Sequence, residues 1–112
     1  MLCDAFDVVV VPFPFVDKPA IKRRPALALT QLDFNDANGH TVFAMITTAK
    51  LDHWQDDYFL VDPGTSGLVQ DCFVRWKLFT LPNELVLKKL GSLGRVDRDA
   101  VSSILKRILP FG

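Results

Sequence analysis

Short apolar segments separated by turn-forming residues make up most of the chain, which is typical of an antiparallel β protein. Residues 7–13 are rich in valine and apolar on both faces, so they predict a central strand. Residues 25–32 fit either a strand or a helix by composition. The polar cluster at 33–40 predicts a hairpin turn with an Asn-Gly pair at its tip, and residues 41–47 predict the antiparallel strand that follows it.

Three further short strands are predicted in the middle of the chain. They fall at residues 58–61, within 68–80, where apolar and cationic residues alternate, and at 84–90. A turn signal at 62–67 separates the first two of these strands. Residues 50–57 are polar and predict a loop or one helical turn.

The last segment has a helical repeat instead. From Val96 to Leu109, apolar residues recur at spacings of one, three and four, which predicts one face of a helix. Acidic residues in its first turn and cationic residues in its last match the helix dipole, and Pro110 ends it. The order predicts a mainly β fold, a small antiparallel barrel or strongly curved sheet capped by a C-terminal α-helix.

The composition fits one globular domain, residues 1–112. Hydrophobic residues make up 49% of the chain, which excludes a disordered segment and suffices for a core. The formal net charge is zero, so an anion site requires a local concentration of cations. We expect a cytoplasmic protein, because the N-terminus lacks the basic region of a signal peptide and the apolar run at 8–15 is too short to span a membrane.

Two cysteines and two histidines limit the metal and acid–base chemistry. Cys3 and Cys72 lack metal-ligand spacing, so we expect no zinc and no other cofactor, and two free thiols are a simpler interpretation than one disulfide. His40 and His53 allow an acid–base pair in principle. A histidine in a polar turn is more often merely solvated, so this pair is the weaker hypothesis.

The clearest candidate site is a proline-bounded segment, residues 13–25, between the first two predicted strands. Arg24 directly precedes Pro25, which favours an extended backbone at the mouth of a buried strand. A guanidinium fixed in this way can bind a phosphate through two parallel hydrogen bonds. A solvated basic loop that protects a sheet edge is the alternative. The segment holds four of the thirteen cations, Lys18, Lys22, Arg23 and Arg24.

Thr47 and Thr48 end the third predicted strand. If the second and third strands are antiparallel neighbours, Arg24 and Thr47 lie at the same end of the sheet. An arginine and a hydroxyl at one rim can hold a phosphodiester and stabilise the charge that develops on it during reaction. Both threonines are otherwise ordinary strand residues.

Six segments, in order along the chain, resemble the MazF/PemK toxins of type II toxin–antitoxin modules. They are residues 7–15, 23–27, 46–48, 67–71, 74–80 and 89–93. The resemblance implies an SH3-like, CcdB-like barrel with a C-terminal helix, usually a homodimer. It also implies a metal-independent endoribonuclease that cleaves single-stranded RNA, including mRNA, inhibits growth, and is neutralised by a cognate antitoxin.

Carried over by position, Arg24 matches the family's catalytic arginine and Thr47 its catalytic threonine. The implied reaction is attack of the RNA 2′-hydroxyl on phosphorus, which gives a 2′,3′-cyclic phosphate and a 5′-hydroxyl end. Arg24 would stabilise the phosphorane, and Thr47 would position a phosphate oxygen. We expect the RNA-binding residues to be Lys18, Lys22, Arg23, Thr48 and Trp54, with Trp54 preferred over Trp76 for base stacking because it lies in a loop.

Several positions depart from the family pattern. Phe6 stands where glycine usually precedes the first strand, and Cys72 stands where serine is frequent. The basic loop has Pro19 and Ala20 in place of Gly-Ser character. The changes near the basic loop affect RNA sequence preference more than the reaction, whereas related folds that include gyrase poisons and silent members leave a second hypothesis open.

That second hypothesis is a non-catalytic module that binds protein. It would be either a gyrase-poison-like domain or an inactive toxin retained for antitoxin binding. Its contacts would be Trp76, Leu105 and Phe111, and Arg24 would be dispensable.

Overall fold

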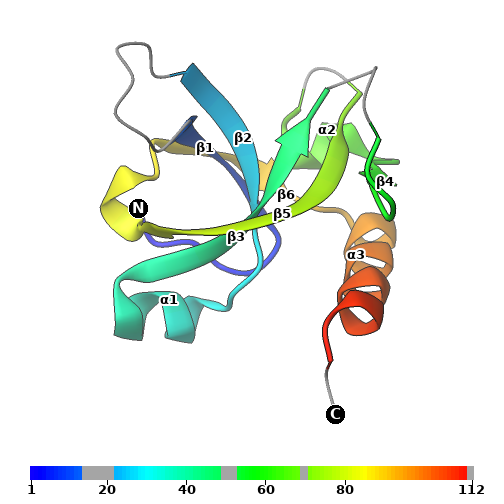
Figure 1. The fold of residues 1–112 in the computed structure, drawn as a ribbon. Coiled ribbons are helices and arrows are strands. Elements are labelled where there is room, and N and C mark those ends of the chain that lie inside the picture. The colour runs from blue at the N-terminus through cyan, green and yellow to red at the C-terminus, as the bar shows by residue number, and fades with distance from the viewer. Residues whose placement is uncertain (14–21, 49–52, 69–70, 111–112) are drawn as a thin grey trace.

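Six strands form one strongly curled antiparallel sheet, with a helix against one side (Figure 1). The computed structural model describes residues 1–13, 22–48, 53–68 and 71–110. The strand order is β4-β5-β3-β2-β1-β6, and every pairing is antiparallel. The strands are β1 Asp7–Phe13, β2 Lys22–Ala28, β3 His40–Thr47, β4 Tyr58–Phe59, β5 Phe73–Pro82 and β6 Lys88–Ser92. The helices are α1 Leu32–Asn38, α2 Pro63–Ser66, the 3-10 turn η1 Asn83–Leu85, and α3 Arg95–Ile108.

The predicted fold class is confirmed as a mainly β half-barrel with a C-terminal helix. The curled sheet ends at β4 on one side and β6 on the other, and these two edges do not pair within the described residues. β1 is central as predicted, because it pairs with both β2 and β6. Its valines are buried on both faces, with Val8 in one core cluster and Val9 and Val11 in the other.

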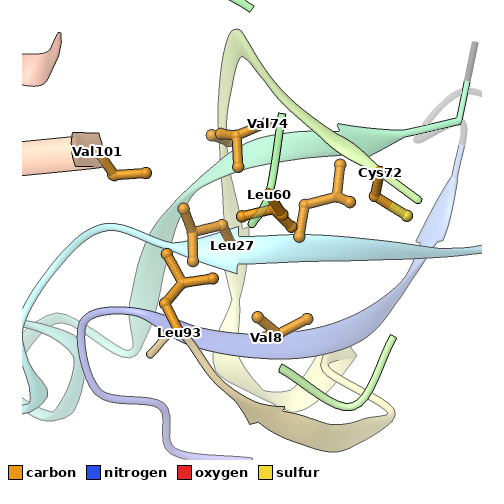
Figure 2. Close-up of a cluster of buried hydrophobic side chains, with 9 residues drawn as sticks. Val8, Leu27, Leu60, Cys72, Val74, Leu93 and Val101 are labelled. Atoms are coloured by element: carbon orange, nitrogen blue, oxygen red, sulfur yellow. The ribbon is translucent and has the colours of Figure 1, made fainter. Parts of the chain in front are cut away.

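The first core cluster fills the space between the sheet and α3. Figure 2 shows Val8, Leu27 and Val74 converging from three strands, while Val101 reaches toward them from α3. Val101 is fully buried, so the predicted apolar face of the helix is the face that packs. Burial of one such valine contributes about 1.5–3 kcal/mol.

The predicted hairpin turn at 33–40 is wrong, because this segment forms α1. Its polar residues are held by tertiary contacts. Asn35 is fully buried, and its side-chain amide donates to the carbonyls of Cys3 and Thr30 at 2.8 and 2.9 Å. Gly39, with φ +64°, ends the helix where the tip of the hairpin was expected. The predicted antiparallel pairing of the flanking strands still holds, with Ala26 opposite Met45.

Other predicted boundaries shift by a few residues. β2 starts at Lys22, earlier than expected, and the turn signal at 62–67 contains the short helix α2. The strand expected at 84–90 is instead η1 followed by β6, whose bounds include Gly91 and Ser92. Of the segment 50–57, residues 53–57 form a loop as expected, while 50–52 lie outside the described residues.

The N-terminus of α3 is attached to the sheet by a buried carboxylate. Asp97 is fully buried and accepts hydrogen bonds from the Tyr58 hydroxyl at 2.7 Å and from the backbone N–H groups of Val61 and Asp62, both at 3.0 Å. Burial, together with the hydrogen bond to Asp97 and its negative charge, raises the pKa of Tyr58 to about 12. The segment that leads into α2 is thereby fixed.

Cys3 and Cys72 are buried in different core clusters, and no disulfide joins them. Burial raises the pKa of both thiols. None of the described helices has both the length and the apolar character needed to cross a membrane.

Candidate functional site

The start of β2 and the end of β3 lie at the same end of the half-barrel, at the top of Figure 1. The last rung of their ladder pairs Ala26 with Met45. Arg24 and Thr47 each lie two residues beyond that rung, on opposite strands, so they face the same opening. Arg24 stays on a regular strand because its other edge pairs with Val11 of β1. The strand pairing therefore brings together two residues that are far apart in sequence.

A cleft of about 390 Å³ opens at this end of the sheet. It is lined by Phe13, Arg24, Met45, Ile46, Thr47, Thr48 and Lys77. Arg24 and Thr48 are exposed, and no residue that the structure describes pairs with the Arg24 guanidinium. The cleft thus combines two cations and two hydroxyls on a partly apolar floor. An anion with several oxygens fits this chemistry.

Two more hollows continue the cleft across the sheet. The first, about 380 Å³, shares Arg24 and Thr48 with the cleft and extends to Arg23, Leu68 and Leu90. The second, about 330 Å³, shares Arg23 and Leu90 with the first and reaches Lys88 on β6. We call the three together the track. Arg24 lies near its middle, so an extended ligand in the track would pass the guanidinium.

Two glycines allow α2 to pack closely against β6 beside the track. A Cβ on Gly91 would lie 2.4 Å from the carbonyl oxygen of Thr65, and one on Gly67 would lie 2.2 Å from that of Leu90. Gly67 also has φ +76°, which disfavours any side chain there. This wall of the track is therefore made of tightly packed backbone.

The other predicted site residues lie in different positions relative to the cleft. Lys22 and Arg23 are exposed on β2, while Lys18 lies outside the described residues. Trp54 is 41% exposed, and its ring lies 5.3 Å from Nζ of Lys77, a residue of the cleft. Trp76 instead packs against the core cluster and donates from Nε1 to the carbonyl of Asp56 at 2.6 Å.

The two histidines cannot act as a pair. His40 pairs with Pro82 at one end of the β3–β5 ladder, and the ring of His53 lies 5.6 Å from that of Phe73 at the other end. The two ends are seven steps apart along β3, from His40 to Thr47, which is roughly 23 Å at about 3.3 Å per residue. The acid–base pair considered from the sequence is therefore excluded by the fold.

Lys77 is the cleft residue that sequence reasoning missed. The β3–β5 ladder shifts register between Ala44, which pairs with Leu78, and Met45, which pairs with Arg75. The two extra residues of β5, Trp76 and Lys77, form a bulge, and bulges redirect side chains. The alternation of apolar and cationic residues was the available signal, but it indicates exposure and not which opening a side chain enters.

Arg75, one of the alternating cations of the strand predicted within 68–80, is buried in an ion pair. Its Nη2 donates to Asp57 Oδ2 at 2.8 Å, and its Nε lies 3.2 and 3.3 Å from the two carboxylate oxygens. The two side chains are 6% and 5% exposed. Burial alone would raise the pKa of Asp57, but the Arg75 hydrogen bonds, the Trp54 N–H and the Arg75 charge outweigh it and lower that pKa.

Another hollow, of about 440 Å³, lies beside α1 and α3. Its lining includes the carboxylates of Asp4 and Asp33 as well as Arg98. Carboxylates repel a phosphate, so the smaller cleft at Arg24 is the better anion site.

Comparison with protein families identifies the chain. The family model described as PemK-like, MazF-like toxin of type II toxin-antitoxin system matches residues 4–109. The chain belongs to this family. The expected resemblance is thereby confirmed over nearly the whole chain. No curated protein sequence matches the chain significantly.

Solved structures from MazF and MazE–MazF crystals and from an endoribonuclease complex have the same fold at low sequence identity. A chain from a MazE–MazF crystal structure of Deinococcus radiodurans (Form-III) is 18% identical with a TM-score of 0.78, and the match covers 100% of both chains. MazF of Deinococcus radiodurans (Form-I) is 18% identical with a TM-score of 0.74, over 99% of each chain. A chain from the structure of a mycobacterial endoribonuclease in complex with its cognate antitoxin is 14% identical with a TM-score of 0.74, over 99% of this chain and 96% of that one.

Proposed function

We propose that this MazF/PemK-like toxin is a metal-independent endoribonuclease that cleaves single-stranded RNA, with Arg24 and Thr47 as its catalytic residues. The observation that carries the proposal is the placement of an exposed guanidinium and two threonine hydroxyls in one cleft of a chain that belongs to this toxin family. The described residues that line the track include neither a carboxylate nor a histidine. Such a lining suits a phosphate held by hydrogen bonds, since Mg²⁺ sites are built from carboxylate oxygens.

The reaction we propose is an internal transesterification. The ribose 2′-oxygen attacks the adjacent phosphorus, and the bond from phosphorus to the 5′-oxygen breaks, leaving a 2′,3′-cyclic phosphate and a 5′-hydroxyl. Arg24 donates two N–H groups to the phosphate oxygens and stabilises the charge that grows on them. Thr47 donates its hydroxyl to one of these oxygens and orients the phosphate. Because an arginine stays protonated, the proton leaves the 2′-hydroxyl and reaches the 5′-oxygen through water.

The track gives the RNA its binding surface. Arg23 and Lys22 supply exposed cations beside Arg24. Thr48 supplies a second hydroxyl where the cleft meets the first of the two hollows that continue it. Lys18, outside the described residues, is proposed to join them. Cations along a groove neutralise backbone phosphates without reading the bases, so they supply affinity more than sequence preference.

We also propose a cognate antitoxin as the protein partner and a homodimer as the working form. Neighbouring structures are a MazE–MazF complex and an endoribonuclease with its cognate antitoxin. An acidic, partly disordered antitoxin segment would fit the cationic track and fold on binding. The proposed compartment is the cytoplasm, where mRNA is available.

The test uses purified protein, a mixed-sequence single-stranded RNA and excess EDTA, with analysis of the product ends. We expect cleavage that survives EDTA and leaves 2′,3′-cyclic phosphate and 5′-hydroxyl ends. Arg24→Ala should reduce the cleavage rate at least about 100-fold, the loss seen when a transition-state donor is removed. The matched control is Arg95→Ala, an exposed arginine at the start of α3, which should cleave normally.

A folded Arg24→Ala protein that still cleaves at the wild-type rate would contradict the catalytic assignment. A folded wild-type protein that leaves RNA intact would favour the non-catalytic module. The structure gives that alternative less support, because Trp76 and Leu105 pack against the core cluster. Phe111, its third proposed contact, lies outside the described residues.

A further inference from the structure

The turn at residues 54–57, just before β4, is closed by hydrogen bonds and presents Trp54 to solvent. Trp54 is 41% exposed, although a tryptophan of ordinary structural role is mostly buried, as Trp76 is here. Backbone and side chain close the turn in both directions. The Trp54 N–H donates to Asp57 Oδ2 at 3.0 Å, and the Asp57 N–H donates to the Trp54 carbonyl at 3.2 Å. The backbone of Trp54 therefore has little freedom.

Three further contacts hold this turn from outside. Arg75 binds the carboxylate of Asp57, as described above. The indole N–H of Trp76 donates to the Asp56 carbonyl, and Arg107 of α3 pairs with the Asp56 carboxylate at 2.6 Å. Asp56 itself has φ +71°, a left-handed conformation that aspartate adopts more often than most residues other than glycine, and the contacts from Trp76 and Arg107 hold it there.

The Trp54 ring is connected to the catalytic cleft through Lys77. Nζ of Lys77 lies 5.3 Å from the ring centroid, and the Arg75 guanidinium carbon lies 5.8 Å from it, both within cation–π range. Lys77 also lines the cleft together with Arg24 and Thr47. The bulge in β5 places it there, since Trp76 and Lys77 are the two residues that have no partner in β3. A phosphate beside Lys77 would thus lie between the cleft and the exposed indole.

We propose that Trp54 is the stacking position for one RNA base outside the scissile phosphate, and that Lys77 binds the phosphate linking that nucleotide to the cleft. This inference rests on the proposed endoribonuclease function. Asp57 and Arg75 are positioning residues, because they act on the RNA only by fixing the turn that carries the indole. The subsite takes any base, since every base has a stacking face. It sets substrate affinity and the position of the strand, and it takes no part in the chemical step.

The test of the stacking position combines protein variants with modified RNA. A set of single-stranded RNAs, each with one abasic nucleotide at a different position, is cleaved by wild-type, Trp54→Phe and Trp54→Leu protein. We expect Trp54→Leu to raise KM about tenfold on intact RNA without changing kcat, while Trp54→Phe stays near wild type. One abasic position should raise the KM of the wild type to a similar extent and leave the KM of Trp54→Leu unchanged. Phe34→Leu, at a 47% exposed aromatic of α1, is the matched control.

The test of Lys77 is the salt dependence of binding. Single-stranded DNA of the same sequence lacks the 2′-hydroxyl and is not cleaved, so its Kd can be measured at equilibrium. Lys77→Gln should flatten the slope of log Kd against log salt by about 0.7, the value for one phosphate contact on a single strand. Lys106→Gln, in the last turn of α3, should leave the slope unchanged.

The outcomes separate this inference from the proposed function. The stacking position is overturned if the wild type cleaves RNA and Trp54→Leu has the same KM. It is also overturned if an abasic nucleotide raises the KM at every position and this rise persists in Trp54→Leu. An unchanged salt slope in Lys77→Gln overturns the phosphate contact. Absence of RNA cleavage by folded wild-type protein overturns the proposed function itself, and the subsite with it.

Discussion

Two strands that contribute cations to the cleft region use arginine in opposite ways. On β2, Arg24 is exposed at the cleft, and none of the described residues neutralises its charge. On β5, Arg75 is buried, and its charge is matched by Asp57 within hydrogen-bond distance. The two guanidiniums are chemically identical, so the difference lies in their partners. An unpaired charge on a regular strand is available to a ligand, whereas a buried charge depends on its partner, because removal of one member leaves the other uncompensated inside the protein.

The same contrast applies to the two tryptophans. Trp76 uses its N–H inside the protein and packs on the core, whereas Trp54 has its backbone fixed and its ring exposed. Trp76, through Asp56, and Arg75, through Asp57, both hold the turn that carries Trp54. Arg75 and Trp76 therefore have structural roles, while Arg24 and Trp54 keep their charge and ring exposed and are the residues we propose to contact RNA. This division predicts which substitutions change stability and which change activity.

The largest effect expected on stability is that of removing Arg75. Arg75→Ala leaves the Asp57 carboxylate buried without its cation, which should lower the free energy of unfolding by about 3–5 kcal/mol. Arg24→Ala removes an exposed side chain with no partner among the described residues and should change it by less than about 0.5 kcal/mol. Chemical denaturation of both variants, followed by circular dichroism, measures the difference.

A double variant shows whether the ion pair or the packing matters. Arg75→Met with Asp57→Leu removes both charges and keeps apolar volume, so it should be clearly more stable than Arg75→Ala. If the double variant is as unstable as the single one, or if Arg24→Ala is equally destabilising, the contrast between a structural and a functional arginine fails.

Whether a residue's role can be predicted from the sequence depends on whether the contacts that define it are local in the chain. β1 and α3 were predicted well because their apolar patterns persist over whole elements. Arg24 and Thr47 were placed at one end of the sheet by strand direction alone, since the start of one strand and the end of its antiparallel neighbour lie at the same end. Their catalytic roles stay predictions.

The features that the sequence did not reveal depend on contacts between distant residues. α1 is a helix of seven residues, and the buried amide of Asn35 holds it by bonding to carbonyls outside it, so its own polar pattern resembled a turn. The partner of Arg75 lies eighteen positions away in sequence. The bulge that places Lys77 in the cleft arises from a mismatch between two strands, and neither strand alone encodes it.

Asp97 is buried with no cation paired to it among the described residues, and it gives an intermediate test of the comparison. Tyr58 is the only tyrosine of the chain, so the ultraviolet absorbance of tyrosinate reports its titration alone. We expect a pKa of about 12 in the folded protein, because burial and the Asp97 carboxylate both disfavour the phenolate. The raised pKa stabilises the fold below the ordinary value of 10.0, and this contribution is lost as the pH rises toward 12.

Asp97→Asn should move the Tyr58 titration back toward 10.0, because the negative charge beside the phenol is removed. Circular dichroism at each pH is the control that the variant remains folded. A titration midpoint that stays near 12 in the folded variant would show that burial alone sets the pKa and that Asp97 contributes little.

The smallest expected effect is the response of the Asp57–Arg75 pair to acid. The pKa of Asp57 lies below its ordinary value of 3.8, so folding favours the carboxylate over the protonated form. The contribution of Asp57 to stability is therefore complete above pH 3.8 and is lost as the pH falls through the lowered pKa. Asp57→Asn cannot lose a charge in this range, so it should be less stable than wild type near neutral pH and lose less stability in acid. Denaturation midpoints of the two proteins should converge as the pH falls, because the other carboxylates are common to both. Parallel curves would mean that Arg75 stabilises the fold through packing, and the contrast with Arg24 would then rest on burial and not on charge.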